Sequence, residues 1–273
     1  MQFINALSLT ANVNIWLANS RHLRILHVFD HACNLINERR EILSIVTPQI
    51  GNGPFNLVVE DHVLFPEYIN IESPVSIVSN QIMLSDRAIH TTNAKLWNAR
   101  PDWEKLHVHR DNILNQLMKF SITDGAFSTS LFSALVNADL STSITAAKQL
   151  AGLGQGLTPA GDDFLLGAIY AAWIIHPPEI CGMLANAIAA TAAPLTTSLS
   201  TAWLRSAGKG EAGILWHQFF DVLISANPAR IQEAMDKILA VGETSGADAM
   251  AGFIGLFMCW GEHCSNLWEY NQT

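Results

Sequence analysis

The spacing of apolar residues divides the chain into two halves with different patterns. Between residues 1 and 100, short apolar and β-branched runs alternate with turn residues, which predicts strands over 23–30, 41–47 and 55–60. The run over 75–85 predicts two short strands that meet at Ser79 and Asn80. We therefore expect this half to be mostly β.

From Pro101 onward the apolar residues follow a helical period. Trp103, Leu106, Ile113, Leu117 and Phe120 recur at helical spacing behind an aspartate. Further helices are predicted over 141–152, 161–175, 179–193, 195–210, 213–225, 228–242 and 245–262. The predicted fold class is α+β, with a β-rich N-terminal domain over residues 1–100 and an all-helical C-terminal domain over residues 101–273.

The composition restricts the partners that the chain can have. Only 15 residues are Lys or Arg and the net charge is -9, which argues against nucleic acid or an anionic membrane as partner. Charged residues make up 14% of the chain against 49% hydrophobic ones, so we expect apolar surface to be covered by self-association or by complex formation.

Three further signals concern location and reactive side chains. The apolar runs 164–175 and 249–260 are shorter than the roughly 20 residues that span a bilayer. The N-terminal residues lack the pattern of a secretory signal, so a cytoplasmic location is expected. The four cysteines form no C-x-x-C pair and the histidines have no zinc spacing, which favours structural roles for both residue types.

The stretch "GLGQGLTPAGDDFLLG", residues 152–167, combines glycines with two acids at the start of an apolar run. Its Gly156-x-x-x-x-Gly161 spacing is that of a phosphate-binding loop, but Asp162 and Asp163 stand where such a loop has Lys and Ser or Thr. Glycines allow positive φ and close approach of the backbone to a ligand. We expect Thr158 to be the N-cap of the following helix, and the two acids either cap this helix or line a site.

Two later stretches show similar chemistry. In "TTSLSTAWLRSAGKG", residues 196–210, Thr196 and Ser200 share a spacing of four, as do Arg205 and Lys209; helix capping and solvation are the simpler interpretations. In "GETSGADAMAG", residues 242–252, Ser245 is predicted as an N-cap with Asp248 at the third helical position. Two acid-bearing helix starts in one helical domain favour convergence on one pocket, which can supply oxygens to a cation and amides to an anion.

Each residue proposed for this site is an acid, carries a hydroxyl or is a glycine, and each lies near a predicted helix start. The candidate catalytic residues are Asp162, Asp163 and Asp248, and Asp162 and Asp163 are also the candidate ligands for a divalent cation such as Mg²⁺. The candidate ligand-binding residues are Gly152, Gly154, Gly156, Thr158, Gly161, Thr196, Thr197, Ser200, Ser245 and Gly246.

The same three stretches, in this order, resemble the AllH-like family. The similarity is specific over roughly residues 150–260, and "HACNLIN" and "GNGPFNLVV" extend it more weakly into the N-terminal half. The resemblance implies a subunit of an oxamate carbamoyltransferase that acts with AllF-like and AllG-like partners in anaerobic allantoin breakdown. The implied reaction converts oxalurate and phosphate into oxamate and carbamoyl phosphate.

The resemblance implies small anionic substrates but identifies no catalytic residue, so the site residues rest on the motifs alone. Two other interpretations are left open by the residues. One is a stand-alone metal-dependent hydrolase or carboxylase-like enzyme that uses Asp162 and Asp163. The other is a scaffold subunit without catalytic function, in which the glycines serve close packing. The peptide "GNGPFNLVVE", residues 51–60, predicts only a hairpin or β-turn.

Overall fold

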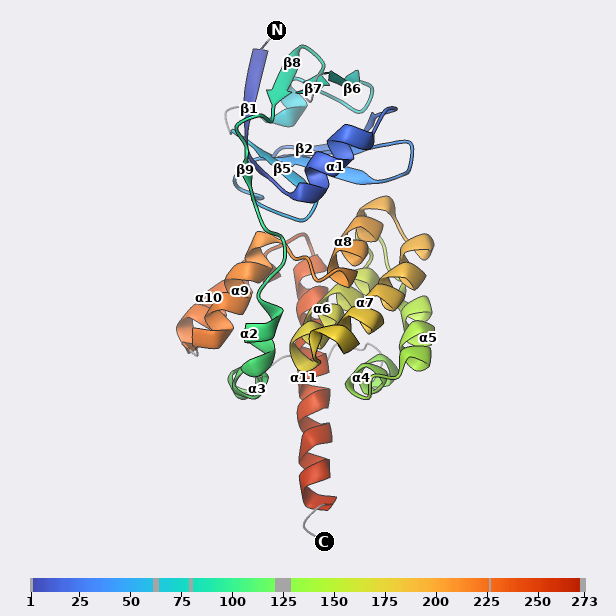
Figure 1. Cartoon of the computed structure of the whole chain (residues 1–273), viewed down its shortest axis with the longest axis vertical. Helices are drawn as coiled ribbons and strands as arrows, with labels where there is room; N and C mark the ends of the chain where they lie inside the picture. Colours follow the sequence, from blue (N-terminus) through green and yellow to red (C-terminus); the bar gives the residue numbers. More distant parts are fainter. Residues whose placement is uncertain (1, 61–63, 79–80, 121–128, 226, 271–273) are drawn as a thin grey trace. The chain divides into compact units, whose positions relative to one another are not determined.

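The computed structural model describes residues 2–60, 64–78, 81–120, 129–225 and 227–270, and it divides the chain into two compact units (Figure 1). Unit 1 consists of Met1–Ala99 together with Ala212–Ile214, and unit 2 consists of Arg100–Glu211 and Leu215–Thr273. The fold class is α+β, as predicted, because strands fill the first unit and helices fill the second.

Unit 1 is a sheet of nine strands among the described residues, in the order β2-β3-β4-β5-β1-β8-β7-β6, with β9 beside β1. Its elements are β1 (Gln2–Leu9), α1 (Ala11–Asn19), β2 (Arg24–Phe29), β3 (Ala32–Ile36), β4 (Ile42–Val46), β5 (Asn56–Val59), η1 (Phe65–Glu67), β6 (Val75–Val78), β7 (Gln81–Leu84), β8 (Arg87–His90) and β9 (Lys95–Leu96).

Apolar residues from one face of the sheet form the core of unit 1 together with helix α1. Cys33, Leu35 and Ile45 on β3 and β4 lie in this core, as do Val13 and Leu17 of α1. Thr10 caps α1, because its side chain accepts a hydrogen bond from the amide of Val13 at 3.2 Å. The predicted strands are confirmed, whereas helix α1 had no predicted counterpart.

The loop before β5 is not a hairpin. Strands β4 and β5 run parallel, with Ser44 opposite Asn56, so the intervening residues must cross from one end of the sheet to the other. A turn does occur there, because the amide of Gly51 donates to the carbonyl of Thr47 at 3.1 Å. The predicted pair β6 and β7 is antiparallel, while the predicted turn residues Ser79 and Asn80 lie outside the described residues.

A short return segment, Ala212–Ile214, belongs to unit 1 although it follows most of the helices in sequence. The amide of Ala212 donates to the carbonyl of Ala99 at 2.8 Å, and the amide of Ile214 donates to the carbonyl of Asn52 at 2.9 Å. These long-range bonds join residues more than 100 positions apart, and no local pattern predicts them.

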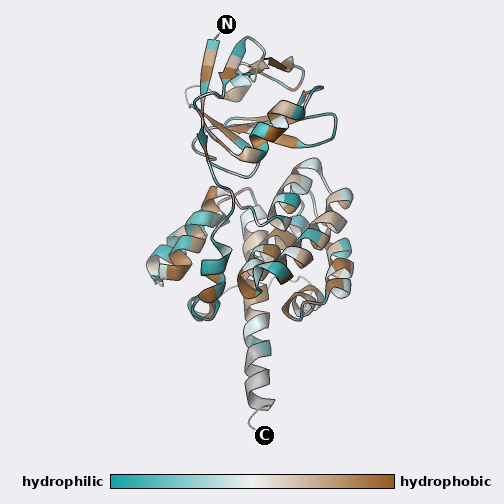
Figure 2. Cartoon of the chain, in the orientation of Figure 1, coloured by the Kyte–Doolittle hydropathy of each residue, from teal (hydrophilic) through white to brown (hydrophobic). Residues whose placement is uncertain are grey.

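Unit 2 consists of helices joined by short connections. They are α2 (Trp103–Val108), α3 (Arg110–Leu117), α4 (Thr129–Val136), α5 (Leu140–Leu150), α6 (Ala160–Ile175), α7 (Pro178–Ala192), η2 (Ala193–Leu195), α8 (Ser198–Gly208), α9 (Ile214–Ser225), α10 (Pro228–Leu239) and α11 (Ser245–Tyr270). Hydrophilic and hydrophobic residues alternate along α10 in Figure 2, as expected for a surface helix with one buried face.

Helices α6 and α11 lie side by side in the middle of unit 2 (Figure 1) and carry its most buried residues. Glycines allow the close contact: a Cβ atom on Gly167 would overlap the backbone of Ala249, and one on Gly252 would overlap the backbone of Phe164. The starts of the two helices are also close, because the hydroxyls of Thr158 and Ser245 lie 2.8 Å apart. None of the described helices is long and apolar enough to cross a membrane.

The predicted helix over 101–120 is interrupted. Helix α2 ends at Val108 and α3 begins at Arg110, because His109 adopts a non-helical ψ of 7°. Helix α4 was not predicted. The other predicted helices are present, with boundaries that differ by a few residues.

Candidate functional site

A loop of glycines connects α5 to α6 and forms one wall of the candidate site. Gly152, Gly154 and Gly156 have φ values of +71°, +118° and +94°, which other residues rarely adopt. A Cβ atom on Gly152 would also lie 2.6 Å from the carbonyl oxygen of Leu195. Glycine is therefore required at Gly152 both by its conformation and by the space around it.

Asp162 fixes the start of this loop. One carboxylate oxygen, Oδ1, accepts the amide proton of Gly152 at 2.9 Å, and the other, Oδ2, accepts a hydrogen bond from the hydroxyl of Thr196. The side chain is buried, with 2% of its surface exposed. Since both oxygens are occupied, the geometry makes Asp162 a positioning residue that connects the loop to the segment before α8.

Thr197 fixes the other end of the loop. Its hydroxyl donates to the carbonyl of Leu157 at 2.6 Å and accepts the amide proton of Ser200 at 3.1 Å, which makes it the N-cap of α8. The predicted capping role is thus present, but the same hydroxyl also holds the glycine loop. The sequence offered one signal for this contact, the Thr196-Thr197 hydroxyl pair at the start of the predicted helix 195–210.

The predicted N-cap at Thr158 is wrong. Helix α6 begins at Ala160 behind Pro159, and no side chain caps it. The hydroxyl of Thr158 instead lies 2.8 Å from the hydroxyl of Ser245, the first residue of α11. Ser245 is therefore the first helical residue rather than the N-cap that was predicted, and the contact brings the starts of α6 and α11 together.

Asp163 lies beside this pair of hydroxyls. Burial raises the pKa of its carboxyl group to about 7, and the charges of Asp248 and Asp162 act in the same direction, whereas the hydroxyls of Ser245 and Thr158 lower it. Its side chain is 7% exposed, and the Oδ2 atom has no hydrogen-bond partner among the described residues. Near pH 7 this carboxyl group is therefore present in both protonated and ionised forms.

The carboxyl group of Asp248, on α11, lies close enough to Asp163 for its charge to act on the Asp163 carboxyl group. Its Oδ2 atom is also buried without a hydrogen-bond partner in the described part of the chain. The hydroxyl of Ser200 near the start of α8, which is 1% exposed, shares this property. Buried polar atoms are nearly always paired in folded proteins, so these atoms are candidate contacts for a ligand or a partner. Buried side-chain atoms of His31, Thr47, Arg87 and Ser143 also lack a hydrogen-bond partner among the described residues, so this property alone does not mark a site.

The backbone of the loop offers hydrogen-bond donors. The amides of Gly154, Gln155 and Gly156 donate to no other residue within the described ranges, and all three residues are exposed. Such amides beside a helix start are suited to bind a small anion. Two other predicted ligand-binding glycines serve packing, because a Cβ atom on Gly161 would overlap the carbonyl of Leu150 and one on Gly246 would overlap that of Ile238.

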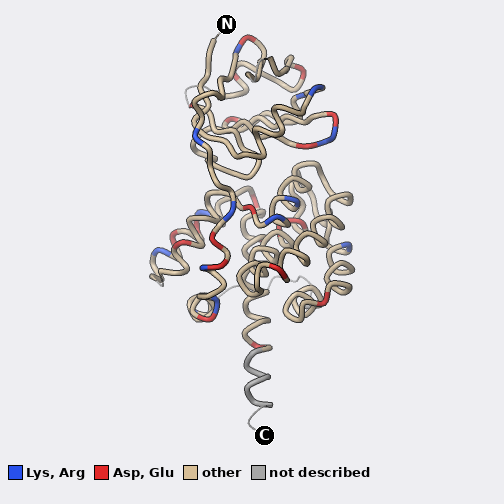
Figure 3. Tube along the Cα trace, in the orientation of Figure 1, with Lys and Arg blue, Asp and Glu red and all other residues tan. Residues whose placement is uncertain are grey.

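Positive charge is missing from this arrangement. No Lys or Arg of the described residues pairs with Asp162, Asp163 or Asp248. Arg205 and Lys209 are exposed near the end of α8, which agrees with the interpretation that they are solvated. Figure 3 shows Lys and Arg scattered along the chain rather than gathered in one stretch.

The donor set does not fit a resident metal ion. Among the residues that the structure describes, no group of three or more His, Cys, Asp or Glu side chains could hold one. The two oxygens of Asp162 are already used in hydrogen bonds. A resident Mg²⁺ ion therefore has no part in the proposed chemistry.

The histidines and cysteines described below contact the backbone or lie buried in the core. The ring of His107 contacts the carbonyl of Ile174 at 2.9 Å, and that of His109 contacts the carbonyl of Lys105 at 2.8 Å. Cys33 and Cys181 are buried, and burial raises the pKa of the Cys33 thiol to about 12, which keeps it protonated. The side chain of Cys264 lies outside the described residues.

The chain combines a strand-rich N-terminal unit with a helical unit, in which acids, hydroxyls and backbone amides lie near the paired starts of α6 and α11. Two family models match the chain: residues 150–257 match the family described as oxamate carbamoyltransferase subunit AllH, and residues 5–96 match the AllH family N-terminal domain. The chain therefore belongs to the AllH family, and this membership implies a subunit of the oxamate carbamoyltransferase complex. No solved structure matches the chain.

Proposed function

We propose that this chain carries the reacting site of an oxamate carbamoyltransferase that converts oxalurate and phosphate into oxamate and carbamoyl phosphate. AllF-like and AllG-like subunits complete the complex, which works in the cytoplasm in allantoin and purine nitrogen breakdown. The observation that carries the proposal is the carboxyl pair of Asp163 and Asp248, whose buried Oδ2 atoms have no hydrogen-bond partner in the described part of the chain. All of the candidate site residues also lie within the matched range 150–257.

The proposed chemistry is the transfer of a carbamoyl group through a tetrahedral centre. A phosphate oxygen forms a bond to the terminal carbamoyl carbon of oxalurate, and the carbonyl electron pair moves onto its oxygen. The amides of Gly154, Gln155 and Gly156 then stabilise the resulting oxyanion. When this centre collapses, the bond between carbon and the oxamate nitrogen breaks, and its electron pair stays with the nitrogen.

Two protons must move in this reaction. Protonated Asp163 donates its proton to the departing nitrogen, because an amide anion is a poor leaving group. Ionised Asp248 accepts the proton of the attacking phosphate hydroxyl. Transfer of a proton from Asp248 to Asp163 then restores the starting state, so protons balance over the cycle. The pKa of Asp163, about 7, suits this donor role near neutral pH.

The experiment is a reconstitution with purified AllF-like and AllG-like subunits. Phosphate-dependent conversion of oxalurate is measured with wild-type chain, with Asp163→Asn or Asp248→Asn, and without the chain. We expect each substitution to lower kcat by roughly 100-fold to 10,000-fold, the typical contribution of general acid and base catalysis. The exposed residue Asp111 on α3 offers a matched control, and Asp111→Asn should keep the wild-type rate.

A scaffold role is the second candidate, and the bonds of Asp162 favour it. Both of its oxygens hold neighbouring segments, which shows that an acid in this loop can serve structure alone. If the double variant Asp163→Asn/Asp248→Asn assembles with its partners and restores the full rate, the reacting site lies in another subunit and the scaffold role replaces our proposal.

A further inference from the structure

Exposed apolar side chains gather around the glycine loop. Leu153 and Leu157 lie in the loop, Leu195 precedes Thr196, and Leu239 and Val241 lie at the end of α10. Their exposed fractions are 49%, 37%, 52%, 39% and 44%. We call these five residues the loop rim. They make up more than half of the large exposed apolar residues in the described part of unit 2.

Each member of the loop rim contacts or adjoins a residue of the candidate site. The carbonyl of Leu157 accepts the hydroxyl of Thr197 at 2.6 Å, and that of Leu153 accepts the amide of Gly161 at 2.8 Å. The carbonyl of Val241 accepts the amide of Gly246 at 3.0 Å.

The two remaining members lie equally close. Leu195 directly precedes Thr196 and faces Gly152, and the Cα atom of Leu239 would lie 3.1 Å from a Cβ atom on Gly246. The backbone of each rim residue therefore lies beside the candidate site or beside a helix start that carries it.

The site inside this border is incomplete for an anionic substrate. It presents acids, hydroxyls and amides, and no Lys or Arg of the described residues pairs with its three acids. Phosphate and oxalurate carry negative charge that neighbouring carboxylates repel. A cation has to approach from another molecule, because backbone amides alone do not offset both the substrate and the acids.

We propose that the loop rim is the docking surface for a partner subunit of the complex, and that this partner places a Lys or Arg side chain over the glycine loop. This proposal rests on the proposed function, because that function requires a site for an anionic substrate. Family membership makes the chain a subunit of a complex, so a covering partner exists. Apolar contact at the rim with a charged group at its centre is the usual anatomy of a specific interface.

A second copy of this chain fits the loop rim poorly. A two-fold contact through the same surface would place Asp163 and Asp248 of one copy opposite the same residues of the other. Like charges would then meet in a place that needs positive charge. Charge complementarity therefore selects a different subunit with a basic centre.

The test uses the full-length chain and purified AllF-like and AllG-like subunits. The double variant Leu153→Glu/Leu157→Glu places two charges on the loop rim, and we expect it to raise the Kd for the partners by at least about 100-fold. The matched control is Ile180→Glu/Met183→Glu on α7, whose side chains are 39% and 53% exposed. We expect the control to change the Kd by less than about threefold.

A second measurement addresses the cation. Binding of inorganic phosphate is measured by calorimetry to the chain alone and to the assembled complex, and we expect the complex to bind phosphate at least about tenfold more tightly. Hydrogen exchange of the amides of residues 154–156 should also slow on assembly, which provides a readout if the double variant fails to fold. Equal phosphate affinity and equal exchange in both states would overturn the proposal.

Three other outcomes are informative. If rim and control variants bind the partners equally well, the rim is not the docking surface. If the chain alone forms a dimer that Leu153→Glu/Leu157→Glu disrupts, a second copy occupies the rim and our assignment is wrong. If Asp163→Asn/Asp248→Asn assembles and is fully active while the rim variant fails to bind, the docking surface stands and the proposed function fails.

Discussion

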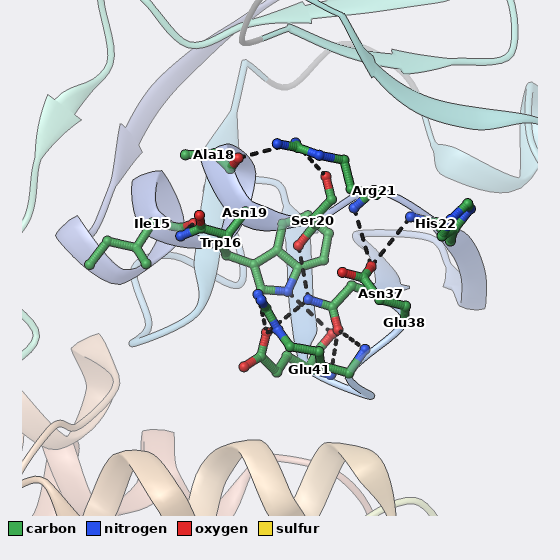
Figure 4. Close-up of polar contacts among 11 residues, drawn as sticks. Ile15, Trp16, Ala18, Asn19, Ser20, Arg21, His22, Asn37, Glu38 and Glu41 are labelled. Atoms are coloured by element: carbon green, nitrogen blue, oxygen red, sulfur yellow. Dashed lines mark hydrogen bonds and ion pairs between the residues drawn. The ribbon is translucent and has the colours of Figure 1, made fainter.

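Two clusters of buried polar side chains, one in each unit, differ in how completely they are paired. In unit 1, Asn37 connects the end of α1 to the β3–β4 turn (Figure 4). Its side-chain nitrogen donates to the hydroxyl of Ser20 at 2.9 Å and to Glu41 at 2.8 Å. Its oxygen accepts the amides of Arg39 and Glu41 at 3.0 and 2.9 Å. Every hydrogen-bonding position of this amide is used.

The cluster around Asp163 in unit 2 is left incomplete. The Oδ2 atoms of Asp163 and Asp248 are buried without partners among the described residues. A fully paired polar network stabilises one conformation, whereas an incomplete one leaves a cost that a ligand or partner can remove. We therefore interpret the Asn37 cluster as structural and the Asp163 cluster as functional, and the following predictions test this contrast.

The largest expected effect is on the pH dependence of stability. The pKa of Asp163 is raised from 3.8 to about 7, so the folded protein binds more protons than the unfolded chain between these pH values. The free energy of unfolding should therefore fall as pH rises from about 4 to about 7, by on the order of 4 kcal/mol, and should not fall further above pH 7.

Asp163→Asn should remove this dependence. Urea unfolding of the wild type and the variant at pH 4, 5.5, 7 and 8.5 measures it, with Asp111→Asn as the control that keeps the wild-type slope. Parallel pH profiles for wild type and Asp163→Asn would mean that burial does not perturb this carboxyl group.

The next effect is on the rate of the reconstituted complex. A general acid with a pKa of about 7 loses its proton as pH rises, so kcat should fall about tenfold for each pH unit above 7. The residual activity of Asp163→Asn should lack this alkaline limb. A rate profile that stays flat from pH 6 to 9 in the wild type would contradict the donor role.

A smaller effect is expected from the paired cluster. Asn37→Ala removes four hydrogen bonds and leaves their partners in a partly buried environment, which should lower the free energy of unfolding by about 2 kcal/mol. Asn19→Ala, at an exposed position of α1, should cost less than about 0.5 kcal/mol. The value of kcat per assembled complex should stay unchanged in both variants, because neither residue lies in the candidate site. A loss of rate in Asn37→Ala would contradict a purely structural role.

The smallest effect concerns the anchor of the glycine loop. Thr197→Val removes the N-cap of α8 and the bond to Leu157, so we expect a loss of about 1 kcal/mol in urea unfolding. Hydrogen exchange of the amides of residues 154–156 should also become faster. Thr145→Val, which loses only an exposed bond to the carbonyl of Ser141, is the matched control.

Local patterns predicted most elements but not the contacts that make the site. The period of apolar residues identified strands β2, β4, β5, β6 and β7 and the helices from α5 to α11, because burial of one face repeats along the chain. Strands β1, β3, β8 and β9 had no predicted counterpart. The capping predicted for the hydroxyls of the 196–210 stretch is present at Thr197. The N-cap predicted at Thr158 is wrong, because its hydroxyl lies beside Ser245 on another helix. Helix α1 was overlooked because it is only nine residues long and stands among strands.

The sequence by itself determined the fold class, the membership in the AllH family and the residues from which the site is built. Glycines, hydroxyls and acids at helix starts are local features, so their chemistry can be read from the chain. Only the tertiary structure decided their roles: it gave Asp162 two partners and left an oxygen of Asp163 unpaired. The physical reason is that adjacent residues on a helix point in directions about 100° apart, and the neighbouring helices determine what each side chain meets.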